Sequence, residues 1–153
     1  MRAPRRHPAG VPTDADPPLP GSIAQLDGLD IAKGAYGGPR VARLSRALRV
    51  PIDALSLGEI RFLLAQGRAV DRLMPVVIAK LEADPFLAAE AGVGDLLLTA
   101  CVVADAAWST DPPWREAFVG LVAGARRRVG DLDAVTRERL EPELDVAEAR
   151  FGA

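Results

Sequence analysis

Apolar residues recur at spacings of three and four positions along most of this chain, in segments separated by helix-capping residues, glycines and prolines. Such spacing places apolar side chains on one face of a helix. No segment shows the sustained apolar–polar alternation typical of strands, and asparagine, a common residue of hairpin turns, is absent. The sequence therefore predicts an all-α fold, a single-domain bundle of six to seven helices. The main expected helices cover residues 40–49, 56–66, 70–83, 96–107, 114–125 and 132–150.

The N-terminal residues differ in composition from the rest of the chain. Residues 1–21 contain six prolines and almost no apolar periodicity, so we expect a disordered Pro-rich tail. Residues 22–153 are then expected to form the helical domain. The N-terminus is basic but lacks the apolar segment of a signal peptide, and no run of 18 apolar residues occurs anywhere. These features predict a cytoplasmic protein that does not enter a membrane.

Polar residues that can open a helix mark most of the expected boundaries. Ser56 is followed three positions later by Glu59, which is the pattern of a capping box. Asp95 and Asp111 each precede an apolar helical segment and are predicted to be N-caps. Pro142 lies within the last expected helix and is predicted to break or kink it.

The chain carries little catalytic equipment. Cys101 is the only cysteine and His7 the only histidine, which excludes an intrachain disulfide and a cysteine-rich zinc site and nearly excludes histidine-based triads. Phosphate-binding glycine motifs, HExxH and GxSxG are absent. Asp71, Asp84 and Asp95 could in principle perform acid–base chemistry, but each lies at an expected helix start, where capping is the ordinary explanation. We therefore expect no enzymatic activity, no metal and no cofactor, and we interpret Cys101 as a small buried side chain.

The net charge of −2 conceals an uneven distribution. Residues 82–125 hold seven acidic side chains against one arginine, a net charge of −6. An acidic stretch of this kind can attract a basic protein, because complementary fields raise the rate of encounter. The alternative is a set of solvated helix faces and caps without a partner.

Residues 41–65 permit a second interpretation, a helix-turn-helix that binds DNA. Two short expected helices are joined there by a turn, and arginines in and around them could contact phosphates. However, the second helix offers only Arg61 and Gln66 for contacts with base edges and is otherwise too apolar to lie exposed in a groove. A DNA-binding regulator therefore stays an alternative rather than the leading hypothesis.

The order and spacing of several short elements resemble the immunity proteins of contact-dependent growth inhibition (CDI) systems. The resemblance covers residues 22–103 and is strongest from residue 56 onwards. An Arg-containing helix ends in a Gln, a Leu-Met-Pro segment opens the next helix, an Asp-Pro ends it, and a Gly-Asp-Leu-Leu begins a buried one. In this sequence the elements are Arg61, Gln66, Leu73-Met74-Pro75, Asp84-Pro85 and Gly94-Asp95-Leu96-Leu97.

This resemblance implies a non-enzymatic antidote that binds the toxic C-terminal domain of a cognate effector in the cytosol. Such toxins are frequently nucleases with basic clefts, and the acidic stretch is the natural place to meet one. The oligomeric state stays open, as does a third hypothesis, a helical adaptor without a toxin partner. Trp108 could be an interface anchor or part of the core, whereas Trp114 is expected in the core. From charge and expected exposure, the candidate partner-binding residues are Glu90, Asp105, Trp108, Asp111 and Glu116.

Overall fold

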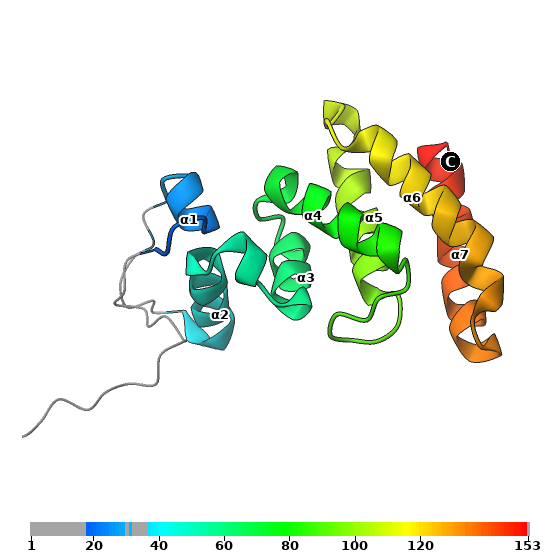
Figure 1. Cartoon of the computed structure of the whole chain (residues 1–153), viewed down its shortest axis with the longest axis horizontal. Coiled ribbons are helices and arrows are strands. Elements are labelled where there is room, and N and C mark those ends of the chain that lie inside the picture. Colours follow the sequence, from blue (N-terminus) through cyan, green and yellow to red (C-terminus); the bar gives the residue numbers. More distant parts are fainter. Residues whose placement is uncertain (1–17, 30, 32–36, 153) are drawn as a thin grey trace, which may run out of the picture. The chain divides into compact units, whose positions relative to one another are not determined.

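The computed structural model describes residues 18–29, 31 and 37–152 (Figure 1). In this part of the chain there are seven α-helices, three short 3-10 helices and no strand, which confirms the all-α prediction. The helices belong to two compact units, Met1–Leu55 and Ser56–Ala153. Residues 1–17 lie outside the described residues, so the disordered tail and the boundary at residue 22 stay predictions.

The first unit is built from α1 (Ile23–Leu26), α2 (Gly38–Arg49) and the 3-10 helix η1 (Ile52–Ala54). Ser22 caps α1 by accepting a hydrogen bond from the N–H of Gln25, as its position before the helix predicts. Backbone hydrogen bonds join the segment before α1 to the segment after α2: the N–H of Leu19 donates to the carbonyl of Arg49, and that of Ile52 to Gly21. These bonds tie the two ends of the unit together.

The second unit contains α3 (Leu57–Ala65), α4 (Val70–Ala83), α5 (Asp95–Ala107), α6 (Arg115–Arg128) and α7 (Ala134–Phe151), with the 3-10 helices η2 (Trp108–Thr110) and η3 (Val129–Asp131). The apolar helix α5 is central, because it packs against α3, α4 and α7. Its residues Leu96, Leu97, Ala100 and Ala104 are fully buried. In Figure 1, α6 (yellow) and α7 (orange) run side by side, and these two helices are in extensive contact. No helix in the described part of the chain has the length and apolarity needed to cross a membrane.

Aromatic side chains close one end of this unit. The ring centroids of Trp108 and Phe151 are 4.5 Å apart, and Phe118 packs edge-on against Phe151 at 5.2 Å and against Trp114 at 6.2 Å. The indole N–H of Trp114 donates to the carboxylate of Asp71 at 3.1 Å, which satisfies the polar atom of an otherwise buried ring. Both tryptophans are therefore core residues, as expected for Trp114 and as one of the two alternatives for Trp108.

Two predicted N-caps are wrong, and of the two alternatives at Pro142, a break or a kink, the break does not occur. Asp95 and Asp111 are not N-caps: the N-cap of α5 is Gly94, and that of α6 is Trp114. Asp111 has a left-handed backbone, φ +50°, and precedes two prolines that lie outside α6. Pro142 does not break α7, which is continuous from Ala134 to Phe151. Pro142 removes one backbone hydrogen bond from this helix, and the neighbouring residues Leu140 and Leu144 are fully buried.

Candidate functional site

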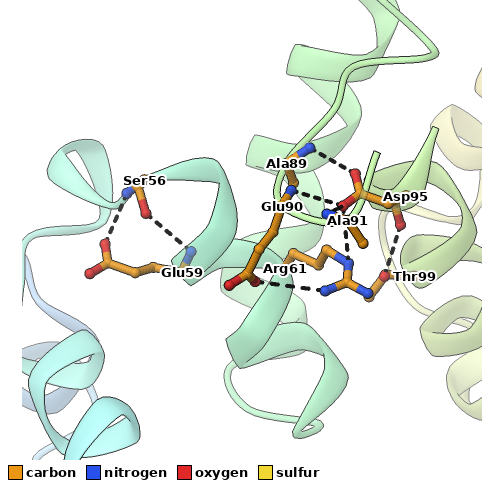
Figure 2. A network of polar contacts seen from close by, with 8 residues as sticks. All are labelled: Ser56, Glu59, Arg61, Ala89, Glu90, Ala91, Asp95 and Thr99. Carbon is orange, nitrogen blue, oxygen red and sulfur yellow. Dashed lines mark hydrogen bonds and ion pairs between the residues drawn. The ribbon is translucent and has the colours of Figure 1, made fainter. Parts of the chain in front are cut away.

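The carboxylate of Asp95 accepts hydrogen bonds from the segment between α4 and α5. Asp95 is the first residue of α5, and its side chain is only 7% exposed. Its oxygens accept hydrogen bonds from three consecutive backbone N–H groups, those of Ala89 at 2.7 Å, Glu90 at 2.8 Å and Ala91 at 2.6 Å (Figure 2). The side chain thus points back at the preceding loop, where it satisfies backbone donors that no helix or sheet would pair.

Arg61 of α3 joins this network from the other side. Its Nε lies 3.5 Å from Oδ2 of Asp95, and its Nη1 lies 3.7 Å from the carboxylate of Glu90 (Figure 2). The hydroxyl of Thr99 donates to the backbone carbonyl of Asp95 at 2.9 Å, one turn further along α5. Three parts of the second unit, α3, the loop and α5, are therefore fixed to one another around one anion.

Two opposing effects act on the pKa of Asp95. Burial disfavours the charged form and by itself would raise the pKa. The hydrogen bonds from Ala89, Ala91 and Glu90 and the positive charge of Arg61 favour the carboxylate and outweigh burial, so the pKa lies below its ordinary value. Asp95 is consequently ionised at neutral pH, and its carboxylate accepts three hydrogen bonds from the backbone of the loop.

The remainder of the loop is equally well ordered by hydrogen bonds. The carboxylate of Asp84 accepts from the N–H of Phe86 at 3.1 Å, and the N–H of Gly94 donates to the carbonyl of Phe86 at 2.9 Å. Arg139 of α7 donates to the carbonyl of Val93. Residues 84–94 are thus a preformed surface element.

Glycine is required at position 94 for two reasons. Its φ of +80° lies in the left-handed region, which side chains other than glycine rarely adopt. A Cβ at this position would also approach the side chain of Leu140 to within 2.9 Å. At the start of α5, Gly94 therefore allows the turn and the close packing of Leu140, while Asp95 accepts the hydrogen bonds of the loop.

The described residues offer little reactive chemistry. Burial and, secondarily, the nearby charge of Glu143 raise the pKa of the Cys101 thiol to about 12, so the thiol is protonated at neutral pH and is a poor nucleophile. In the described part of the chain, no three His, Cys, Asp or Glu side chains are placed to hold a metal ion. The structure presents a helical scaffold with a hydrogen-bonded loop and charged surfaces.

The acidic candidate residues are mostly engaged in ion pairs. Glu90 pairs with Arg61, as described above, and Asp105 pairs with Arg150 of α7. Asp111 pairs with Arg115 at 3.2 Å although its side chain is 84% exposed. Glu116 is exposed and makes no ion pair with a described residue. A basic partner would have to compete with arginines at three of these four positions.

These candidates do not form one continuous patch. Glu90 precedes the first residue of α5, whereas Asp105 lies near the end of that helix and Asp111 and Glu116 follow it. The helical rise between residues 95 and 105 is about 15 Å. Trp108 is 8% exposed and lies under the guanidinium of Arg115, whose Cζ is 4.3 Å from the ring centroid. The structure therefore groups Asp105, Asp111 and Glu116 at one end of α5 and leaves Glu90 at the other.

The pairing of Arg61 with Asp95 was not predicted from the sequence. The two residues are distant in the chain, and local sequence patterns assign Arg61 to one helix and Asp95 to the N-cap of another. One signal could have pointed to it: the segment Ala88–Val93 before Asp95 contains no side chain able to satisfy its own backbone donors except that of Glu90. An adjacent acid beside such a segment is a candidate acceptor for those N–H groups.

The fold is a small helical one whose α4–α5 loop is held by hydrogen bonds, and comparison with known families identifies the class of protein. Residues 26–117, more than half of the chain, match the family of CDI immunity proteins. The chain therefore belongs to this family. The match includes Arg61, Asp95 and the loop between them and excludes α7. No curated protein and no solved structure shows significant similarity to the chain.

Proposed function

We propose that this protein binds the toxic C-terminal domain of a cognate CDI effector in the cytoplasm and thereby neutralises it. The observation that carries the proposal is the family match over residues 26–117. The low reactivity of the Cys101 thiol is consistent with a protein that acts by binding rather than by catalysis, and so is the engagement of the Asp95 carboxylate in hydrogen bonds to the backbone.

The distribution of charge supports a basic partner. The second unit carries sixteen acidic against eleven basic side chains, a net charge of −5, whereas the first unit carries five against eight, a net charge of +3. An anionic unit attracts a toxin domain that carries a basic cleft, as nucleases do, and accelerates its encounter with the antidote.

Glu90, Asp105, Asp111 and Glu116 remain the candidate residues for this electrostatic attraction. Their exposure and their existing ion pairs suit a role in the rate of association, because exposed charges at the rim of an interface act mainly on that rate. Trp108 is buried, and its ring packs against Phe118 of α6 and Phe151 of α7, so we assign it a structural role.

The DNA-binding alternative loses support. Its two helices, α2 and α3, belong to different compact units, and the apolar residues of α3, Ile60, Leu63 and Leu64, are buried. No observation favours it or the adaptor hypothesis over toxin binding.

The proposal is tested by expressing the toxin domain encoded beside this protein's gene in a bacterial host, with and without the protein. We expect growth arrest by the toxin alone, rescue by co-expression, and a stoichiometric complex of the purified partners by size-exclusion chromatography. A toxin domain from an unrelated effector is the control, and rescue should be absent there. Growth arrest despite equal amounts of folded protein would refute neutralisation of that toxin.

A further inference from the structure

The loop that Asp95 organises forms one wall of a surface hollow in the second unit. The hollow has a volume of about 370 Å³ and lies between the 84–93 segment and the end of α6 with η3. Its apolar walls are Phe86, Val93 and Leu132. Phe86 is 7% exposed and so forms a firm floor, whereas Val93 is 40% exposed and accessible at the surface. None of these residues was a candidate from the sequence.

The charged residues around the hollow are predominantly acidic. Asp84 and Asp131 line it together with Arg128, the last residue of α6. A second hollow of about 190 Å³ also borders Arg128 and is lined by Gly124 of α6 and Glu82 of α4. The larger hollow therefore has two carboxylates and one guanidinium in its lining, a net charge of −1, and Glu82 adds a third carboxylate at the adjoining hollow. This balance favours a cationic rather than an anionic occupant.

The shape of the larger hollow exists before any partner binds. Arg139 holds the carbonyl of Val93, and Asp95 holds the N–H groups of Ala89, Glu90 and Ala91. A wall fixed in this way loses little conformational entropy on association, which strengthens binding without additional contacts.

We propose that this hollow is the docking site for a basic segment of the cognate toxin domain. An arginine or lysine of the toxin enters it, with the aliphatic stem against Phe86 and Val93 and the cationic group directed to Asp84 and Asp131. The inference rests on the proposed function, since it assigns a surface to the same binding event. It commits to the toxin as occupant because of the charge balance and the apolar walls.

The test measures the affinity of the purified full-length chain for the toxin domain encoded beside it, by isothermal titration calorimetry at physiological salt. The double variant Asp84→Asn/Asp131→Asn removes two charges and keeps the size of both side chains. We expect it to weaken binding about tenfold or more, because a cation seated between the carboxylates would lose its partners. Val93→Arg places a bulky cation in the opening and should weaken binding on the order of 30-fold or more, as for a central contact residue.

Matched controls separate the hollow from general effects of charge and bulk. Glu138→Gln/Glu143→Gln removes two exposed charges of α7, and Val146→Arg adds the same bulk at an α7 position that is 66% exposed. Both controls should change the affinity less than about threefold, because none of these residues lines either hollow. Trp fluorescence and circular dichroism establish that each variant is folded.

The outcomes distinguish this inference from the proposed function. If the unchanged protein binds the toxin and the hollow variants bind equally well, or no worse than the controls, the docking site is refuted and the function stands. If the unchanged protein does not bind, both fail. If Val93→Arg alters the sedimentation of the protein alone and leaves toxin affinity unchanged, a second copy of this chain occupies the hollow, and the inference is likewise overturned.

Discussion

Removal of the Asp95 carboxylate is the perturbation whose consequence follows most directly from the structure. The carboxylate accepts hydrogen bonds from Ala89, Glu90 and Ala91 and lies beside Arg61, while its side chain is 7% exposed. A hydrogen bond to a charged group contributes about 1.5–3 kcal/mol. Glu90 and Ala91 are exposed, so water can replace part of what their N–H groups lose. We therefore expect Asp95→Ala to lower the free energy of unfolding of the second unit by about 3 kcal/mol, less than three full bonds.

Asp95→Asn separates the contribution of charge from that of shape. The amide oxygen can replace Oδ2, which accepts from both Glu90 and Ala91, but the amide NH2 then faces the N–H of Ala89, which donates to Oδ1. One bond is lost and two donors meet, so the expected cost is about 2 kcal/mol. The unchanged protein is then the most stable of the three, Asp95→Asn is intermediate and Asp95→Ala is the least stable.

Urea denaturation followed by tryptophan fluorescence is the appropriate assay. Trp108 and Trp114, the only tryptophans, both lie in the second unit, so the signal reports on the unit that contains Asp95. The control is Asp105→Ala, whose ion pair with Arg150 involves side chains that are 56% and 51% exposed. Such surface pairs contribute at most about 1 kcal/mol. If Asp95→Ala costs no more than Asp105→Ala, the loop is not held by this carboxylate and the reasoning is refuted.

The lowered pKa of Asp95 adds a pH dependence of known sign. A carboxyl whose pKa is lower in the folded than in the unfolded state stabilises the fold above its unfolded pKa, about 3.9, and this stabilisation is lost as the pH falls through the folded pKa. The difference in stability between the unchanged protein and Asp95→Asn should therefore be constant near neutral pH and should shrink below about pH 4. A constant difference throughout acid titration would show that the pKa of Asp95 is not lowered.

Three further predictions concern other parts of the second unit. The raised pKa of Cys101 predicts that iodoacetamide alkylates the native thiol at least about tenfold more slowly than the thiol in urea at the same pH, and equal rates would show an accessible thiolate. Gly94→Ala should cost about 1–3 kcal/mol in the same urea assay, because it places a Cβ in a left-handed conformation against Leu140, whereas Gly130→Ala, where a Cβ meets no atom within 4 Å, should cost less. The charge hypothesis predicts that replacing four acidic residues with lysine slows association with the toxin at low salt, and an unchanged rate would contradict it. The four residues are Glu90, Asp105, Asp111 and Glu116.

The helices could be predicted from the sequence because their signals are local. The apolar spacing between residues 70 and 83 predicts the extent of α4 to within two residues, and the reciprocal hydrogen bonds of Ser56 and Glu59 form the capping box that their spacing predicts. In α3, capping and the buried face favour the same structure, whereas α4 forms from its buried face although it has no side-chain cap and contains Pro75.

The candidate site could be predicted only in part, because its partners are distant in the chain. An acid before an apolar helix is usually an N-cap, yet Asp95 accepts hydrogen bonds from a loop that precedes it, and that loop also contacts Arg61 and Arg139, which are distant in the chain. The ion pair of Asp105 with Arg150 is equally remote in sequence. Ion pairing could not be inferred for Glu90 and Asp105, whose arginine partners lie on other helices, whereas the pair of Asp111 with Arg115 is local in sequence.

These contacts separate two physical roles for the acidic side chains of the second unit. Asp105 and Asp111 are already neutralised by neighbouring arginines, so their substitution changes the long-range field more than it removes a contact with the toxin. Asp84 and Asp131 share a hollow whose apolar walls can exclude water from an incoming side chain, and a charge interaction strengthens as water is excluded. Variants of the first pair should therefore act on the association rate and its dependence on salt, and variants of the second pair on the dissociation rate. Surface plasmon resonance at two salt concentrations resolves the two effects, and a change in the same rate constant for both pairs would show that the acidic residues act as one surface.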